Sequence, residues 1–398
     1  MRRTYKYKVK LKQNAKQKAE EQLGLACSLY KACIEQRRTA WQRCGESVSG
    51  IDQKNELPEL KKDEDFSDYK KIGSQVLQDV IERTDMAYQH FFRRVRQGET
   101  PGYPRYKSWN RYQSITFKQA GWKYLHGGRL KLQGIGVIKF FESRELPEGS
   151  QVKTVTLKRD SCGDWFICFS LDNVQVKPLP KTGKQISLDL GLKKFFTDDK
   201  GKNLDNPRFL KKNERNLKLE QRKLSKKKSR GQLNKDGVPS EGKNREKQRV
   251  KVAKLHRKIA RCREDFHFKT AHYLVSNYDQ IVIEDLNIQG MIDQGGLNKS
   301  IYDVGWGQFV EILLFKAEEA GKEVIQVDPK NTTQMCSNCR SLPEIKKTLR
   351  DRTHLCKDCG FTLDRDHNAA LNILVKGIPK QELEEVKYEG GKRPLARD

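Results

Sequence analysis

The chain of 398 residues has no long apolar run and no internal repeat of about 20 to 50 residues. No stretch reaches the roughly 18 consecutive apolar residues of a membrane-spanning helix, and no amphipathic surface anchor stands out. Residues 1–11 alternate polar and apolar side chains and lack the apolar core of a signal peptide. We therefore expect a cytoplasmic protein without a membrane partner, whose first residues form a strand.

The spacing of a disulfide framework is also missing. Six of the ten cysteines are scattered irregularly along the chain, at Cys27, Cys33, Cys44, Cys162, Cys168 and Cys262. In the reducing compartment that we expect, such thiols stay reduced and behave as small buried hydrophobes or inert surface groups. The other four cysteines need a different explanation.

Acidic residues are too few to balance the basic ones. The chain has 80 Lys plus Arg against 52 Asp plus Glu, which gives a formal net charge of +28. Basic side chains that neutralise phosphates release counterions, and this release supplies most non-specific affinity for nucleic acids. The charge favours a polyanionic partner. The alternative is a ribosome-associated or simply well-solvated basic protein.

The first part of the chain predicts a small β-barrel interrupted by two packed helices. The length fits about two or three domains. Apolar periodicity predicts a helix over 14–44 and another over 69–97, separated by a polar, acidic interruption over 46–68. Short β-rich segments predict strands over 3–11, 114–117, 130–138, 152–158 and 165–171, with a hairpin turn at 160–163. We expect the barrel to comprise 1–12 and 99–183, and the helical insertion 13–98.

The second part, after a linker at 178–184, has the pattern of an α/β domain. Apolar runs predict strands over 186–191, 280–286 and 323–327 and a helix over 307–320. The strongly basic segment 208–278 predicts two helices joined by a loop at 231–242, with a solvated coiled-coil face as the alternative. We expect a charged, loose tail over 379–398. Together the two parts make an α/β multidomain protein.

The remaining cysteines form two pairs, Cys336-x2-Cys339 and Cys356-x2-Cys359, with sixteen residues between the pairs. This is the spacing of a four-cysteine zinc site. Four thiolates complete a tetrahedron and leave no open position, so the expected Zn²⁺ is structural. The second pair continues directly into a segment that carries an acid, Asp366.

Three acids stand in well-defined contexts. Asp189 lies between apolar residues that share one strand face, so its side chain points to the opposite face near the strand end. Glu284 ends an apolar run, where a parallel strand delivers residues to a crevice. Asp366 begins a helical pattern, and a plain N-cap is the alternative for it.

Converging acids repel one another, and protons or cations must compensate them. Oxygen ligands suit Mg²⁺ or Mn²⁺. Two such ions about 4 Å apart hold both the attacking and leaving oxygens of an in-line phosphodiester displacement. The three acids together are far more specific than any one of them.

At these motifs the sequence resembles the TnpB family, transposon-encoded RNA-guided DNA endonucleases related to the compact type V CRISPR nucleases. The resemblance covers most of the chain. It rests on the segments 101–108, 188–192, 283–287, 334–339, 351–360 and 364–373.

This resemblance implies a fold and a set of roles. It implies an RNase H-like RuvC nuclease domain over 184–330 and 362–378, an inserted zinc ribbon over 331–361, and a wedge-type barrel with a helical recognition insertion. Catalytic, metal-binding roles pass to Asp189, Glu284 and Asp366, with Asp364 as the alternative to Asp366. Arg352 matches a family arginine and is expected at the scissile phosphate, a surface salt bridge being the alternative.

One departure from the family pattern concerns the first cysteine pair. Arg340 stands there where the family has Gly. The turn is expected to change at this position, while all four metal ligands remain.

Basic and aromatic side chains alternate over 103–112. Rings stack on unpaired bases while Arg and Lys follow phosphates. The alternative is that alternate rings face the barrel core. We expect contacts with guide RNA or target DNA from Tyr103, Arg105, Tyr106, Lys107 and Arg111.

We therefore expect an RNA-guided, metal-dependent DNA endonuclease in which guide pairing selects the target. It is expected to act as a monomeric ribonucleoprotein on double-stranded DNA, associated with the nucleoid when bound to DNA. The alternatives are a catalytically silent RNA-guided DNA-binding protein, a rejoining transposase or accessory transposition protein, and a non-catalytic zinc-ribbon RNA-binding protein.

Overall fold

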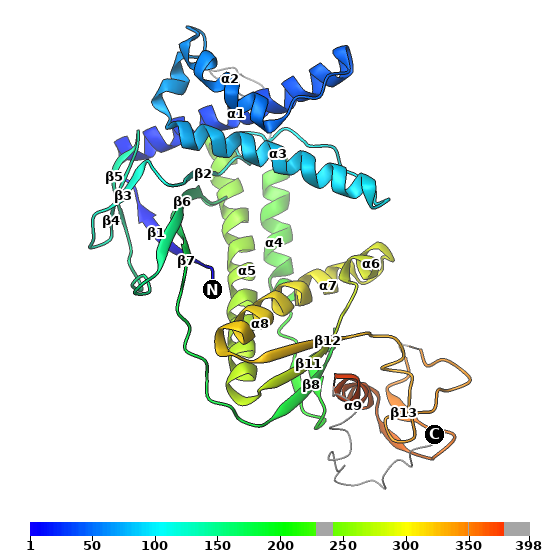
Figure 1. Ribbon diagram of the computed structural model, residues 1–398. Helices are drawn as coiled ribbons and strands as arrows, with labels where there is room; N and C mark the ends of the chain where they lie inside the picture. The colour runs from blue at the N-terminus through cyan, green and yellow to red at the C-terminus, as the bar shows by residue number, and fades with distance from the viewer. Residues whose placement is uncertain (228–241, 349, 378–398) are drawn as a thin grey trace. The chain divides into compact units, whose positions relative to one another are not determined.

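The computed structural model describes residues 1–227, 242–348 and 350–377 (Figure 1). The chain divides into two compact units, Met1–Gln175 and a second that begins at Val176. No described helix is both long and apolar enough to cross a membrane. The tail predicted at 379–398 and residues 231–241 of the loop predicted at 231–242 lie outside the described residues, and the finer domain limits stay predictions.

An antiparallel seven-stranded sheet forms the centre of the first unit, in the order β2-β6-β7-β1-β5-β4-β3. Its strands are β1 (Arg3–Lys10), β2 (Ser114–Phe117), β3 (Trp122–Tyr124), β4 (Arg129–Leu132), β5 (Gly136–Phe140), β6 (Gln151–Arg159) and β7 (Trp165–Asp172). The sheet curls into a nearly closed barrel, as predicted. The rings of Tyr7, Tyr124, Phe140 and Phe169 fill it, with centroids as close as 5.3 Å.

The single strand predicted over 130–138 is wrong. The segment forms two strands, β4 and β5, which pair antiparallel. The chain reverses at Gly134 and Gly136, whose φ angles of 72° and 102° are open to glycine and unfavourable for other residues. Two glycines within three residues were the available signal for this hairpin.

Helices α1 (Gln13–Cys44), α2 (Gly50–Lys62) and α3 (Ser74–Arg96) and the 3-10 helix η1 (Ser67–Lys71) complete this unit. The two long helices confirm the prediction, but the interruption predicted over 46–68 is wrong because it contains α2. The Ser49 side chain accepts the N–H of Asp52, and the Asp52 carboxylate accepts the N–H of Ser49. This capping box starts α2, and Pro58 inside the helix does not end it.

A five-stranded sheet forms the centre of the second unit, in the order β10-β9-β8-β11-β12. Its strands are β8 (Gln185–Leu190), β9 (Lys194–Asp198), β10 (Asn203–Asp205), β11 (Gln280–Glu284) and β12 (Glu323–Val327). Strands β8, β11 and β12 are parallel, while β9 pairs antiparallel with β8 and β10 with β9. The three predicted strands are confirmed, and β9 and β10 are additional.

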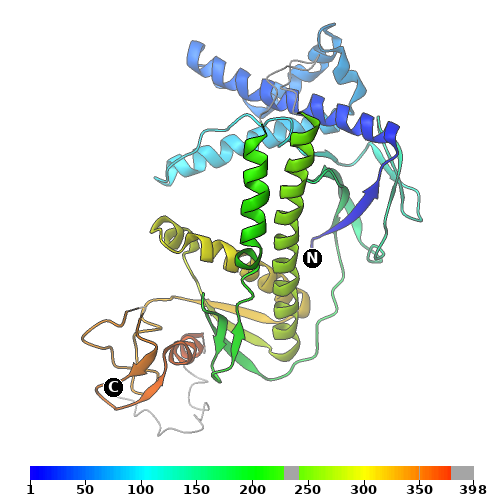
Figure 2. The same ribbon diagram turned by 180° about the vertical axis from the view of Figure 1, so that it is seen from behind.

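Helices cover both faces of this sheet. The long helices α4 (Phe209–Lys226) and α5 (Lys243–Asn277) lie side by side, as predicted for the basic segment (Figure 2). Helices α5 and α8 (Trp306–Ala320) pack on the face that carries Leu188 and Ile283. Helix α9 (Arg365–Gly377) packs on the opposite face, where the Ser187 hydroxyl donates to the Ala370 carbonyl over 2.6 Å.

Four shorter elements also belong to the second unit. Helices α6 (Ile288–Asp293) and α7 (Asn298–Val304) connect β11 to α8. Strands β13 (Thr353–Leu355) and β14 (Thr362–Asp364) pair antiparallel and lead directly into α9. None of these short elements was predicted from the sequence.

Candidate active site and metal centre

Asp189 and Glu284 lie at matching positions of two adjacent parallel strands. Leu188 of β8 is paired with Ile283 of β11, and the acids are the next residue of each strand. Because side chains alternate along a strand, both acids fall on the face that α9 covers. The register of the sheet therefore brings Asp189 and Glu284 together at the carboxyl ends of the parallel strands, as predicted.

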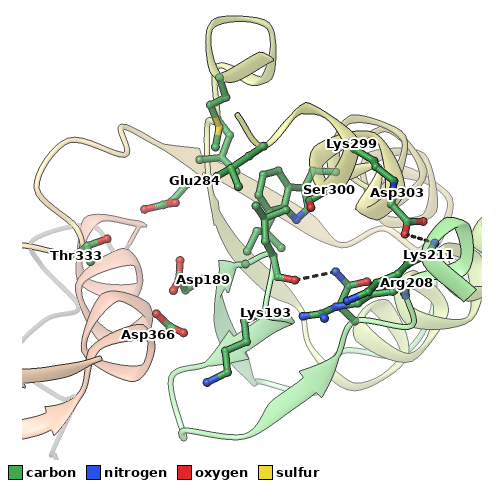
Figure 3. A pocket seen from close by; sticks show the side chains of 18 of the residues that line it. Asp189, Lys193, Arg208, Lys211, Glu284, Lys299, Ser300, Asp303, Thr333 and Asp366 are labelled. Carbon is green, nitrogen blue, oxygen red and sulfur yellow. Dashed lines mark hydrogen bonds between the residues drawn. The ribbon is translucent and has the colours of Figure 1, made fainter. Parts of the chain in front are cut away.

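Asp366 reaches the same place from the first turn of α9. All three acids line one pocket of about 720 Å³. Figure 3 shows their carboxyl groups gathered on one side of this pocket. The rest of its wall combines apolar side chains, the acids Glu214 and Asp303, and the basic residues Lys193, Arg208, Lys211, Lys299, Arg352 and Arg365.

The surroundings make ionisation of the strand acids costly. Burial raises the pKa of Asp189 well above its usual value, and the nearby charges of Glu284 and Asp366 raise it further. Burial also raises the pKa of Glu284, against the opposing effects of the Thr332 hydroxyl and the Lys376 charge. A bound cation would offset these costs, because it stabilises the ionised form of carboxyl groups that lie close together.

Asp364 and Asp366 have different contacts. The Asp364 carboxylate accepts the N–H groups of Asp366 and His367, at 3.0 and 3.1 Å. Asp364 therefore performs the capping that was the alternative for Asp366. The Asp366 carboxylate lines the pocket and accepts from Nε and Nη2 of Arg365, at 3.2 and 3.1 Å.

The role of Arg365 was missed from the sequence. Its side chain is buried, and its Nη1 donates to the carbonyls of Thr348 and Asp351, at 3.2 and 3.1 Å. Its guanidinium thus joins the ribbon segment to Asp366. A basic residue between two acids, Asp364-Arg-Asp366, was the available signal. Arg352 also lines the pocket, from the ribbon side.

The four ribbon cysteines come together as predicted. The four Sγ atoms of Cys336, Cys339, Cys356 and Cys359 all lie within 4.8 Å of one another. In the described part of the chain this is the only set of three or more such donors close enough to hold one ion. The ligand oxygens of the three acids are not all within this distance of one another.

The turn predicted to change at Arg340 keeps its geometry. The N–H of Arg340 bonds to the Cys336 carbonyl over 3.0 Å, and the N–H of Gly360 bonds to the Cys356 carbonyl over the same distance. The φ angles of Arg340 and Gly360 are 66° and 71°. Arg340 thus adopts a left-handed conformation that favours glycine.

The five predicted nucleic-acid contacts all lie in the first unit, outside this pocket. Tyr103 and Tyr106 are each 43% exposed, whereas Tyr112 is buried in the core. The Tyr106 hydroxyl bonds to the Glu35 carboxylate, and the Lys107 ammonium lies 4.9 Å from the centroid of the Tyr30 ring. Arg105 and Arg111 are exposed. The alternative of core-facing rings holds for Tyr112, and Trp109 is partly buried against the same core.

Two family models match the chain. The OrfB IS605 model, described as "Probable transposase", matches residues 166–294, which include Asp189 and Glu284. The model described as "Cas12f1-like, TNB domain" matches residues 306–373, which include the four cysteines and Asp366. The two models together therefore contain every residue of the proposed acidic site and the cysteine cluster.

Curated relatives match over most of their length. A Streptomyces pristinaespiralis protein named "Putative RNA-guided DNA endonuclease" is 28% identical over 382 residues, covering 95% of this chain and 90% of the relative. The InsQ protein of Escherichia coli K12, with the same description, is 27% identical over 340 residues, covering 82% and 79%.

A solved structure of similar fold is the Cas12f1–sgRNA–target DNA complex. The TM-score is 0.55 at 14% identity, with 91% of this chain and 83% of that chain covered. The likeness shows a shared, Cas12f1-like fold. The three acids, the cysteine cluster and these relatives together confirm the resemblance of this chain to the TnpB family.

Proposed function

We propose that this protein is an RNA-guided DNA endonuclease that hydrolyses phosphodiester bonds of double-stranded target DNA. The observation that carries the proposal is the pocket in which acids from two parallel strands and a covering helix converge. The full-length relatives named above support it, as does the Cas12f1 complex, which contains guide RNA and target DNA. A monomeric ribonucleoprotein, nucleoid-associated when bound to DNA, remains our working assembly.

The second unit supports assignment as an RNase H-like RuvC domain. Its central strand β8 lies between the antiparallel β9 and the parallel β11, and helices cover both faces. The ribbon follows β12 and precedes α9, so it is an insertion before the last helix. This placement brings the end of the ribbon to the acid on α9.

The acidic side of the pocket fits divalent cations. Asp189, Glu284 and Asp366 offer only oxygen donors, which suit Mg²⁺ or Mn²⁺. We propose two such ions, since a pair about 4 Å apart can hold both the attacking and the leaving oxygen of a phosphodiester displacement. Such ions, when bound, supply a water of lowered pKa and stabilise charge at the phosphate. The acids themselves hold and orient the ions, and no side chain acts as a nucleophile.

The basic side of the same pocket fits the nucleic-acid backbone. Lys193, Arg208, Lys211 and Lys299 line it (Figure 3). The Asp303 carboxylate accepts the N–H of Lys211 over 3.1 Å and so holds the start of α4 beside the pocket. Lys and Arg side chains there would neutralise phosphates next to the cut bond. We assign Arg352, on the ribbon, to the scissile phosphate.

The cysteine cluster fits a structural Zn²⁺. Four sulfur donors within 4.8 Å of one another leave no position for a substrate. Tyr103, Arg105, Tyr106, Lys107 and Arg111 remain our candidates for contacts with guide RNA or target DNA.

The test is substitution of Asp189 by Asn, which removes one charge and keeps the shape. The variant ribonucleoprotein is expected to bind matched DNA as the unaltered protein does and to lose cleavage by about a hundredfold to a thousandfold, since removal of one catalytic electrostatic group costs that order. EDTA should abolish cleavage by the unaltered protein. Binding without nicks by the unaltered protein at any Mg²⁺ concentration would favour the catalytically silent alternative.

A further inference from the structure

The chain between β12 and the first cysteine pair is fastened to α9 by two asparagines. Asn368 and Asn372 lie one helical turn apart, and both are fully buried. Nδ2 of Asn368 donates to the Met335 carbonyl over 2.9 Å, and its Oδ1 accepts the N–H of Ser337 over 2.9 Å. Nδ2 of Asn372 donates to the carbonyls of Thr332 and Met335, each over 2.8 Å.

Thr332 links this fastened segment to the acid on β11. Its side chain is buried, and its Oγ1 lies 2.5 Å from Oε1 of Glu284 and 2.9 Å from the Pro329 carbonyl. A hydroxyl has one proton, and an ionised carboxylate is the stronger acceptor. With Glu284 ionised, the hydroxyl therefore donates to Oε1 and fixes the rotation of the carboxylate.

Arg340, beside the first cysteine pair, also contacts Asn372. Its Nη1 donates to Oδ1 of Asn372 over 2.8 Å. With this bond, both ends of the buried Asn372 amide have partners. The contact gives a reason for a long side chain at φ 66°, where Gly360 stands at the matching position of the second cysteine pair.

We propose that Thr332 is a positioning residue for Glu284, and that Asn372 and Arg340 fix Thr332 to the first cysteine pair. The inference rests on the proposed function, because it assigns Glu284 to the metal ions. It extends that function by a continuous path, Arg340–Asn372–Thr332–Glu284, from the cysteine cluster to the acidic pocket. Hydrogen bonds of this kind orient metal-ligating side chains, and their loss typically costs roughly tenfold to a hundredfold in metal affinity or activity.

The test is a titration of the ribonucleoprotein with Mn²⁺, followed by electron paramagnetic resonance in the absence of DNA, so that binding is measured apart from cleavage. Thr332→Val keeps the side-chain shape and removes the hydroxyl. We expect roughly tenfold weaker Mn²⁺ binding or more, with zinc content and melting temperature unchanged. Thr332→Ser should restore the affinity, and Thr353→Val, an exposed ribbon position, serves as the matched control.

A second variant tests the connection to the ribbon. Arg340→Gly relieves the left-handed backbone and removes the bond to Asn372, so we expect Mn²⁺ affinity to fall in the same direction by a smaller factor. Unchanged Mn²⁺ affinity in Thr332→Val would overturn the proposal. So would a lower zinc content or melting temperature in that variant, because Thr332 would then have a structural role only.

Failure of the proposed function has a different signature. In that case the unaltered protein would show no Mn²⁺ binding that Asp189→Asn weakens, whatever the Thr332 variants do. In the same titration, Asp189→Asn therefore tests the proposed function, and the Thr332 variants test the positioning role of Thr332.

Discussion

At the scale of residues, Asp364 and Asp366 show that two neighbouring acids of one motif have separate contacts. Asp364 is exposed and accepts two backbone N–H groups at the start of α9, while Asp366 lines the pocket. A side chain that satisfies helix N–H groups is not available as an ion ligand with the same oxygen. The geometry therefore favours Asp366 as the third acid of the proposed site.

Substitutions at the two positions should separate these roles. Asp366→Asn is expected to abolish cleavage with little change in melting temperature. Asp364→Ala is expected to lower the free energy of unfolding by about 1 kcal/mol, through loss of the cap, and to leave cleavage within a few-fold. Asp364→Ser, which retains a capping oxygen, should recover the stability. Cleavage that survives in Asp366→Asn but disappears in Asp364→Ser would reverse the assignment.

His267 gives the second unit a pH-dependent stability. The side chain is fully buried, and Nε2 lies 3.0 Å from the Val304 carbonyl. Burial lowers the pKa of His267 to about 4, against the opposing Val304 hydrogen bond. The unfolded chain binds a proton near pH 6.5, and the folded chain does so only near pH 4. The contribution of neutral His267 to the free energy of unfolding is therefore fully present above pH 6.5 and is lost as the pH falls to 4.

The expected loss is on the order of 3 kcal/mol over this interval. Urea unfolding of the unaltered protein and of His267→Phe at several pH values measures it. Phe keeps a ring against Phe195 and Phe309, whose centroids lie 5.6 and 5.7 Å from that of His267. The variant should lose less stability between pH 6.5 and 4 than the unaltered protein. Equal slopes would show that His267 does not titrate as proposed.

At the scale of elements, helix α9 connects the sheet, the ribbon and the acidic pocket. Ile373 and Leu374 pack on Val282 and Val327 of the sheet, while Asn368 and Asn372 hold the ribbon segment. Its first turn carries Asp366. A disturbance of the ribbon is therefore expected to reach the pocket through α9.

Cys356→Ser tests this connection. Structural zinc modules lose their fold when a ligand is lost, so we expect less than stoichiometric zinc, a lower melting temperature and loss of cleavage together. Cys44→Ser, an exposed free cysteine outside the cluster, is the control and should change none of these. A Cys356→Ser protein that lacks zinc and still cuts at the normal rate would show that the ribbon does not support the pocket.

The sequence was sufficient for the features that depend on local pattern. Apolar periodicity and apolar runs predicted the long helices and the three parallel strands, and cysteine spacing predicted the cluster. Helix α2 was missed because its charged composition and Pro58 concealed a capping box. The contacts of Thr332 with Glu284 and of Asn372 with Thr332 join residues 48 and 40 positions apart, so no local pattern signals them.

At the scale of the whole molecule, a net charge of +28 is combined with a pocket in which burial raises the pKa of Asp189 and Glu284. The excess basic charge suits a nucleic-acid partner, and the acids suit the cations that act on it. No side chain in the pocket is expected to read base sequence, which leaves target choice to guide pairing. Basic side chains are thus assigned to nucleic-acid binding, and the three acids are assigned to the metal ions that cut the bound strand.

The most direct test of this account is cleavage of duplex DNA by the ribonucleoprotein after sequencing the RNA that purifies with it. The guide segment of that RNA is replaced, and DNA matched to the old and new guides is offered with Mg²⁺. We predict that cutting follows the guide, requires Mg²⁺ and disappears in Asp189→Asn. Cutting that ignores the guide sequence, or persists in Asp189→Asn, would contradict the account.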